Sequence, residues 1–232
     1  MTYKESIQET CRKLNIDYND VAAGLNELFK LDDLKSWINL AAQRAWDFHK
    51  WIFSEEAVYS QTSSEEYYDY PDNFVSDSIF LLKVEQADGK METYGKKRYE
   101  DYMKYREDYS DGEDKIFSDY RRYYFINPNT FSGAGRKIEI WGKKRATRLS
   151  VDADLLPFSP DTDDEENSGN EAIVNIAYAI ALASDKKKDP SKAAREEADA
   201  YTMLKIIADK EKEEQIRYQV KNRPLFDIPQ FF

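Results

Sequence analysis

The stretch from Glu171 to Ser184 reads EAIVNIAYAIALAS, and it predicts a helix that is apolar on nearly all sides. A helix of this kind is buried by neighbours on several sides at once. The chain has 232 residues, of which 41% are hydrophobic, so it is long enough to build such a core. We therefore expect Glu171 to Ser184 to form the centre of a helical core to which other segments contribute.

Several other segments have helical spacing. Apolar residues recur every three or four positions between Leu31 and Phe53, which predicts a helix with one buried face. Shorter helices are expected over Tyr3 to Leu14 and over Asp20 to Lys30. Beyond Pro190, a helix of about 45 Å is expected from Ser191 to Asn222, because each residue adds about 1.5 Å. Its second half carries mostly Lys and Glu, so it is too polar to be packed inside one small subunit.

Between Ser54 and Ser150 the pattern becomes that of strands. Ile79 to Glu85 and Met91 to Tyr94 predict a hairpin, because Asp88-Gly89 between them is a strong turn signal. Strand patterns also occur around Ala57 to Gln61, around Tyr68 to Tyr70, over Tyr120 to Ile126 and over Lys137 to Trp141. Within this region, Lys96 to Ser110 alternates Tyr with charged residues at helical spacing and predicts an exposed helix.

These patterns together predict an α+β fold. We expect a helical bundle formed by N- and C-terminal helices, with a central β-rich insertion and an extended C-terminal tail. The expected parts are residues 1–53 and 171–222 for the bundle, 54–150 for the insertion, 151–170 for an acidic loop and 223–232 for the tail. The loop is expected because it combines many acidic residues with Pro and Gly and contains no basic residue.

Charge and residue usage exclude several classes of protein. The net charge is −11, so the molecule as a whole should repel nucleic acid and anionic membranes. Cys11 is the only cysteine, which excludes an intrachain disulfide. The N-terminus lacks a secretory signal, and no stretch approaches the roughly 20 apolar residues of a membrane span. We expect synthesis in the cytoplasm and no membrane partner.

Groups that could perform catalysis are few. His49 lies in WDFHKWIF and is interpreted as a packing or surface residue, while Cys11 lacks an activating neighbour and is expected to be buried. Gly133 to Lys137 lacks the spacing of a phosphate-binding loop and predicts a β-turn. DTDDEE, Asp161 to Glu166, lacks the spacing of a calcium loop. The sequence therefore predicts a protein that is not an enzyme and that has neither a cofactor nor a metal.

The end of the chain is unusually apolar for a segment that follows a polar helix. Leu225, Phe226, Ile228, Phe231 and Phe232 all lie after Pro224, which forbids continuation of the helix. So many exposed apolar groups are a liability unless the tail docks. The tail could dock on its own domain or into a neighbouring protein, and the sequence leaves both open.

Four segments, taken in order, resemble one family. They are INLAAQRAWDFHKW; YYDYPDNFVSDSIFLLKV; KIEIWGKKRATRLSVDADLLPF, followed by the acidic loop and EAIVNIAYAIALAS; and the charged last helix with its R-x-L-F-D-x-P tail. The whole chain resembles the head-to-tail adaptor proteins of tailed bacteriophages. The expected Lys96 to Ser110 helix departs from the simplest pattern of the family.

This resemblance implies a structural virion protein that forms an oligomeric ring, typically dodecameric, between portal and tail. The implied partners are the portal protein, neighbouring copies of the chain and tail or nozzle proteins, with genomic DNA passing through the ring without specific binding. The implied location is the head-to-tail junction of the virion, with the host cytoplasm as the site of assembly.

The resemblance also suggests sites. It assigns portal binding to the tail residues Arg223, Leu225, Phe226, Asp227, Ile228, Pro229, Phe231 and Phe232. The acidic loop would face the channel or a subunit interface through Asp161, Asp163, Asp164, Glu165 and Glu166.

Two other classes of function stay open at this point. An acidic DNA mimic would inhibit a nucleic-acid-binding protein and would need its carboxylates on one rigid surface. A hydrolase with a carboxylate site would show a substrate-dependent thermal shift or a metal requirement.

Overall fold

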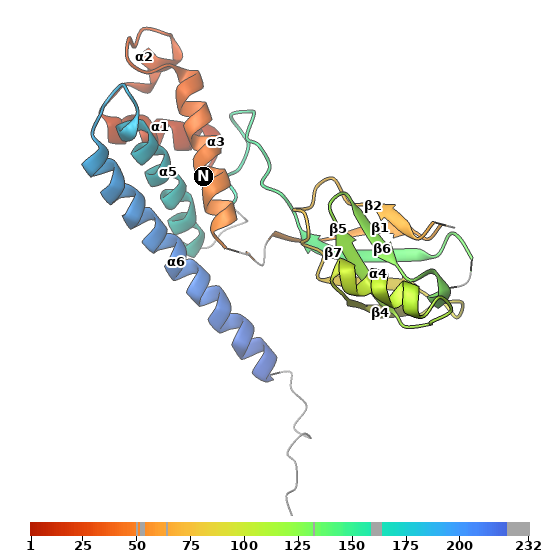
Figure 1. Cartoon of the computed structure of the whole chain (residues 1–232). Coiled ribbons are helices and arrows are strands. Elements are labelled where there is room, and N and C mark those ends of the chain that lie inside the picture. Colours follow the sequence, from red (N-terminus) through yellow and green to blue (C-terminus); the bar gives the residue numbers. More distant parts are fainter. Residues whose placement is uncertain (50, 52–53, 64, 132, 159–163, 222–232) are drawn as a thin grey trace, which may run out of the picture. The chain divides into compact units, whose positions relative to one another are not determined.

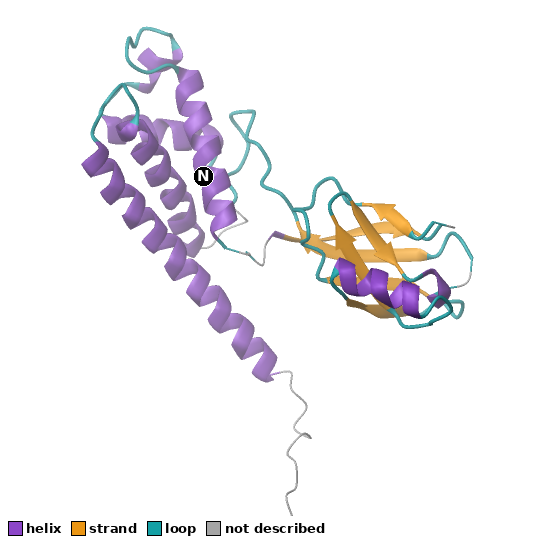
Figure 2. Ribbon diagram, viewed as in Figure 1, coloured by secondary structure: helices purple, strands orange, loops and turns teal. Residues whose placement is uncertain are grey.

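A computed structural model describes residues 1–49, 51, 54–63, 65–131, 133–158 and 164–221. The fold is α+β, and its described part contains six α-helices and a curled seven-stranded sheet (Figure 1, Figure 2). The chain divides into two compact units. One consists of residues 1–51 and the described residues after 145, and the other of residues 52–145. We call them the helical unit and the β-rich unit.

The helical unit is built around one buried helix, α5. Its helices are α1 (Tyr3–Leu14), α2 (Tyr18–Ala22), α3 (Leu31–Phe48), α5 (Asp164–Ala183) and α6 (Pro190–Lys221). Helix α5 contacts α1, α3 and α6. Among its side chains, Ile173, Val174 and Ile176 are completely buried, and each burial of this kind is worth about 1.5–3 kcal/mol.

Local signals set the ends of helix α1. The Thr2 side chain accepts a hydrogen bond from the backbone N–H of Glu5, whose carboxylate in turn accepts from the N–H of Thr2. The helix ends at Asn15, which adopts the left-handed conformation with φ 57°. The expected Tyr3 to Leu14 helix is therefore confirmed.

The helix expected over Asp20 to Lys30 is wrong for most of its length. Helix α2 covers only Tyr18–Ala22. Gly24 follows with φ +72°, which no helix can continue, and the Asn26 side chain accepts hydrogen bonds from the N–H groups of Leu28 and Phe29. These side chain to backbone bonds satisfy amides that a helix would otherwise have paired.

Helix α3 ends earlier than expected. It stops at Phe48, and His49 is already extended with φ −144°. Trp51 then folds back, so that its Nε1 donates to the carbonyl oxygen of Ala45 at 3.0 Å. The Trp51 ring is fully buried and packs edge-on against Phe158.

The acidic loop expected over residues 151–170 is also shorter than predicted, because residues 164–170 form the first turns of α5. Two features explain the difference. Acidic residues at the start of a helix interact favourably with its dipole. In addition, Gly169 lies so close to the Phe158 ring that a Cβ there would be 2.4 Å from it, and the Asn170 amide donates to the Phe158 carbonyl. Packing therefore selects the helix where composition suggests a loop.

The β-rich unit is a single sheet with strand order β1-β7-β3-β4-β5-β6-β2. Its strands are β1 (Glu55–Gln61), β2 (Tyr67–Asp69), β3 (Leu81–Glu85), β4 (Met91–Lys96), β5 (Ile116–Tyr120), β6 (Tyr123–Ile126) and β7 (Lys137–Lys143). The expected hairpin is confirmed by the antiparallel pairing of β3 with β4. The neighbouring pair β4 and β5 is parallel, and helix α4 (Tyr99–Asp108) lies in the connection between them.

Two expectations for this unit need correction, and one strand was missed. Strand β5 did not stand out in the sequence. The single strand expected over Tyr120 to Ile126 is interrupted, because a turn at Arg121-Arg122 joins β5 to β6. Arg121 has φ +58°, a conformation that reverses the chain direction within two residues. Helix α4 lies within the expected Lys96 to Ser110 segment, but it is not simply exposed, since its Tyr102 is fully buried.

A tyrosine fixes the segment that leads into β3. The Tyr70 hydroxyl accepts hydrogen bonds from the backbone N–H groups of Ser78 at 2.8 Å and Ile79 at 3.2 Å, and it donates to the Val75 carbonyl at 3.0 Å. Burial raises the pKa of Tyr70, so the hydroxyl stays protonated and able to donate. Tyr70 belongs to the core of the unit with Phe74, Ile79 and Leu82.

We predict that Tyr70→Phe destabilises the β-rich unit by about 1–3 kcal/mol, because the buried amide of Ile79 loses its acceptor. Urea unfolding followed by tryptophan fluorescence measures the change. Tyr109→Phe is the matched control, since Tyr109 is 62% exposed. Equal stability of the two variants would contradict the role of the Tyr70 hydroxyl.

Candidate functional site

The residues assigned by resemblance lie mostly outside the described part of the chain. All eight tail residues, Arg223 to Phe232, are outside it, as are Asp161 and Asp163. Asp164, Glu165 and Glu166 begin helix α5, and the structure describes their backbone only.

His49 and Cys11 both occupy packing positions. The His49 Nε2 lies 3.3 Å from Glu211 Oε2 of α6, and its ring packs edge-on against Trp51. His49 thus links the end of α3 to α6. Cys11 is buried, and desolvation raises the pKa of its thiol to about 11, which keeps it in the unreactive protonated form at neutral pH.

No cluster of three or more His, Cys, Asp or Glu side chains among the described residues could hold a metal ion. No helix in the described ranges is long and apolar enough to cross a membrane.

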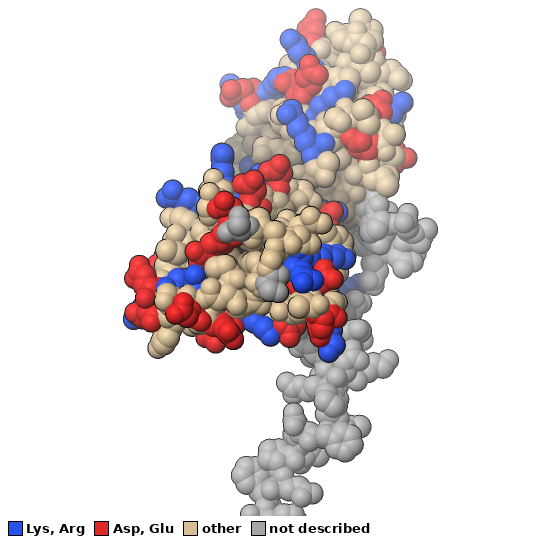
Figure 3. All heavy atoms as spheres, turned by 90° about the vertical axis from the view of Figure 1, so that its right-hand side faces the viewer, with Lys and Arg blue, Asp and Glu red and all other residues tan. Residues whose placement is uncertain are grey.

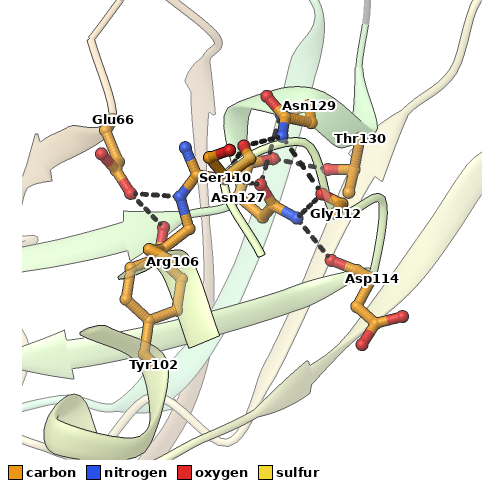
Figure 4. Close-up of polar contacts among 9 residues, drawn as sticks. All are labelled: Glu66, Tyr102, Arg106, Ser110, Gly112, Asp114, Asn127, Asn129 and Thr130. Carbon is orange, nitrogen blue, oxygen red and sulfur yellow. Dashed lines mark hydrogen bonds and ion pairs between the residues drawn. The ribbon is translucent and has the colours of Figure 1, made fainter. Parts of the chain in front are cut away.

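The most developed polar arrangement of the β-rich unit attaches helix α4 to the sheet (Figure 4). Glu66 Oε1 accepts from the Tyr102 hydroxyl at 2.9 Å and from Arg106 Nε at 3.0 Å. Arg106 also donates to Asn127 Oδ1 at 3.0 Å and to the carbonyl of Ser110 at 3.2 Å. Burial, and then the charge of Glu66, raises the pKa of Tyr102, so its hydroxyl remains a donor to that carboxylate.

Asn127 secures the segment that follows α4. Its side-chain Nδ2 donates to the carbonyl oxygens of Gly112 and Asp114, each at 2.9 Å, and Asn127 is fully buried. Asn129 reinforces this from the surface by donating to the carbonyls of Ser110 at 2.7 Å and Gly112 at 3.2 Å (Figure 4). The backbone between Ser110 and Asp114 is thus held by four side-chain amide hydrogen bonds. The path of the backbone through this loop is thus fixed.

Exposed acidic side chains lie on this segment and on the last two residues of helix α4. They are Glu107, Asp108, Asp111, Glu113 and Asp114, which we call the acidic end of the β-rich unit. Among the residues that the structure describes, none of the five forms an ion pair. In the space-filling view, Asp and Glu side chains lie in several groups around the edge of this unit, with Lys and Arg side chains between them (Figure 3).

A second exposed group surrounds the turn between β5 and β6. Arg121 and Arg122 are both exposed there, and the guanidinium carbon of Arg121 lies 5.0 Å from the centre of the Tyr120 ring. The exposed rings of Tyr123 and Tyr67 pack edge-on beside them. We call Arg121, Arg122, Tyr67, Tyr120 and Tyr123 the arginine turn. Arginine and tyrosine are the residues most enriched at the energetic centres of protein interfaces.

The sequence contains partial signals for both surfaces. Arg121-Arg122 between two Tyr-rich stretches was visible as a short basic segment. The fixation of the acidic end was not, because Asn127 is 13 and 15 residues from the backbone groups that it holds.

We predict that Asn127→Asp loosens the acidic end, because the carboxylate keeps an acceptor for Arg106 but loses both N–H donors. Amide hydrogen exchange of residues 109–115 should become faster, and stability should fall by about 1–3 kcal/mol. Asn19→Asp makes the same change at an exposed position of helix α2, away from this segment, and serves as the control. An unchanged exchange rate in Asn127→Asp would disprove the proposed fixation.

Comparison with known proteins agrees with the resemblance in the sequence. A search of curated proteins gave no match. A family model described as SU10 adaptor protein matches residues 1–225, which is nearly the whole chain. The chain therefore belongs to the SU10 adaptor protein family, a family of phage head-to-tail adaptors.

Proposed function

We propose that copies of this chain assemble into a closed ring, dodecameric as the resemblance implies, that joins the portal to the tail and surrounds the DNA channel. The role is structural and not catalytic. The observation that carries the proposal is the family match over residues 1–225, which includes both units and helix α6. The ring would be assembled in the host cytoplasm and would remain at the head-to-tail junction of the virion.

Helix α6 supports this role because it extends beyond the core of its own unit. It has 32 residues and is therefore about 48 Å long. Its buried apolar residues are Ala193, Ala200, Leu204 and Ala208. From Asp209 to Glu213 the described side chains are acidic or basic, and four of these five are exposed. The described side chains from Asp209 to Glu213 therefore contribute little to the core, and in the sequence the helix leads directly to the apolar tail.

We assign portal binding to that tail. Its apolar anchors would be Leu225, Phe226, Ile228, Phe231 and Phe232, with Arg223 and Asp227 as polar contacts. Pro229 would restrict the conformations of the unbound tail and so lower the entropy cost of docking. Tail or nozzle proteins would bind at another surface of the ring.

The excess of acidic over basic residues is compatible with a ring through which DNA passes. A ring that attracted DNA at many sites would retard its passage, whereas a net charge of −11 per chain opposes such binding. Asp161, Asp163, Asp164, Glu165 and Glu166 would then face the channel or a subunit interface.

Truncation tests the tail directly. Deletion of residues 224–232 should abolish cosedimentation with purified portal, because the apolar anchors are gone, while circular dichroism should stay unchanged. A second variant that replaces the five apolar tail residues by Ser keeps the length and should also fail to bind. Portal binding by either variant would overturn the tail assignment.

A further inference from the structure

We infer that neighbouring copies contact each other head to tail through the β-rich unit, with the acidic end of one copy against the arginine turn of the next. This inference rests on the proposed ring and specifies one of its subunit contacts. It follows from where the two charged surfaces lie on a single element, strand β5.

The two surfaces lie at opposite ends of β5. Helix α4 begins beside the end of the strand, where the rings of Tyr99 and Tyr120 stack at 4.4 Å. It ends at Asp108, and the acidic segment then returns the chain to Ile116, the first residue of β5. Five strand residues span about 13 Å from first to last. The acidic end and the arginine turn are thus separated by the length of the strand and cannot neutralise each other within one copy.

Within the described part of the chain, no carboxylate of the acidic end forms an ion pair. The two basic residues that flank it are already engaged, Arg106 with Glu66 and Lys115 with Glu92. The buried amide of Asn127 fixes the backbone at Gly112 and Asp114, so this backbone needs little further ordering on binding. Acidic side chains on such a segment favour a partner with a basic surface.

The arginine turn has the complementary properties. Neither Arg121 nor Arg122 forms an ion pair with another residue in the described part of the chain. Arg121 has φ +58°, a backbone conformation that favours glycine. A long charged side chain therefore occupies a position where the backbone conformation is unfavourable for it. Lys97 and Arg98 add positive charge before α4 and balance Glu100 and Asp101, which begin the helix.

The exposed tyrosines add apolar surface to the arginine turn. Tyr67, Tyr120 and Tyr123 are between 38% and 51% exposed, the Tyr120 ring lies under the Arg121 guanidinium, and the rings of Tyr67 and Tyr123 pack against each other. An acidic loop that docked here would bring its carboxylates to Arg121 and Arg122 while the rings exclude water.

A second copy of the chain is the occupant that fits. Each copy carries both an acidic end and an arginine turn, so the same contact can repeat from copy to copy. A repeated contact between two different surfaces closes into a ring when its rotation divides a full turn. Nucleic acid could also bind Arg and Tyr side chains, but the β-rich unit carries the acidic end as well, which opposes a polyanion.

A charge-exchange experiment tests the contact in the full chain. Arg121→Glu with Arg122→Glu reverses the turn, and Asp111→Lys with Glu113→Lys reverses the acidic end. Closed rings on purified portal are counted by electron microscopy, and self-association is followed by sedimentation velocity. Each double variant should lose ring formation by about tenfold or more, because like charges then face each other. A chain with all four changes should regain it, since the signs are exchanged and the attraction returns.

Lys187→Glu with Lys188→Glu is the matched control, because it makes the same charge change at exposed positions of the helical unit and should leave the rings intact. Circular dichroism and thermal unfolding show that each variant is folded. The proposed contact is wrong if the wild-type protein forms rings and the reversed variants form them equally well. It is also wrong if the chain with all four changes does not regain ring formation. In both cases the proposed ring itself would be unaffected.

Failure of the wild-type protein to form rings would overturn both the contact and the proposed function. A labelled single-stranded oligonucleotide provides the remaining check. Binding by the wild type that is lost in Arg121→Glu with Arg122→Glu, with ring formation unchanged, would assign the turn to nucleic acid and overturn the contact.

Discussion

The burial of helix α5 holds together helices that lie far apart in the sequence. Its sides are covered by α1 and α3, which precede the β-rich unit, and by α6, which follows. Completely buried Ile173, Val174 and Ile176 leave this helix no stable alternative in water. The segments before and after residues 52–145 must therefore meet around α5, and the β-rich unit is inserted into the helical unit as a loop would be.

This arrangement separates two tasks. The helical unit positions α6, whose polar second half leads to the apolar tail. The β-rich unit has its own core around Phe74, Leu82 and Ile140, and its own polar network around Glu66 and Asn127. A unit with its own core presents its charged surfaces on a scaffold separate from the packed helices. In the proposed ring, one unit would engage the portal and the other would contribute a contact between copies.

Features with local causes were predictable from the sequence. Helix α1 has a capping box at Thr2, helix α6 begins at Pro190, and the β3–β4 hairpin turns at Asp88-Gly89. Features with distant causes were not. Strand β5 buries Ser118 and Asp119, whose polarity predicts surface positions. Burial of the Asp119 carboxylate is possible because it pairs with Lys96 on the neighbouring strand. Residues 164–170 resemble a loop in composition but form a helix, because Gly169 and Asn170 pack against Phe158.

The candidate sites show the same division. The arginine turn was visible as a basic pair, whereas the fixation of the acidic end depends on Asn127 and on backbone groups that only the fold brings together. The tail was selected for its apolar composition, and its docking partner remains a proposal, since residues 222–232 lie outside the described part of the chain.

The central claim is that copies of this chain form a closed ring on the portal. Electron microscopy of the wild-type protein mixed with purified portal tests it most directly. The account predicts a regular ring of identical copies on one face of the portal, with the β-rich units of neighbours in contact. Bare portals, or portals that carry isolated copies without contacts between them, would contradict it.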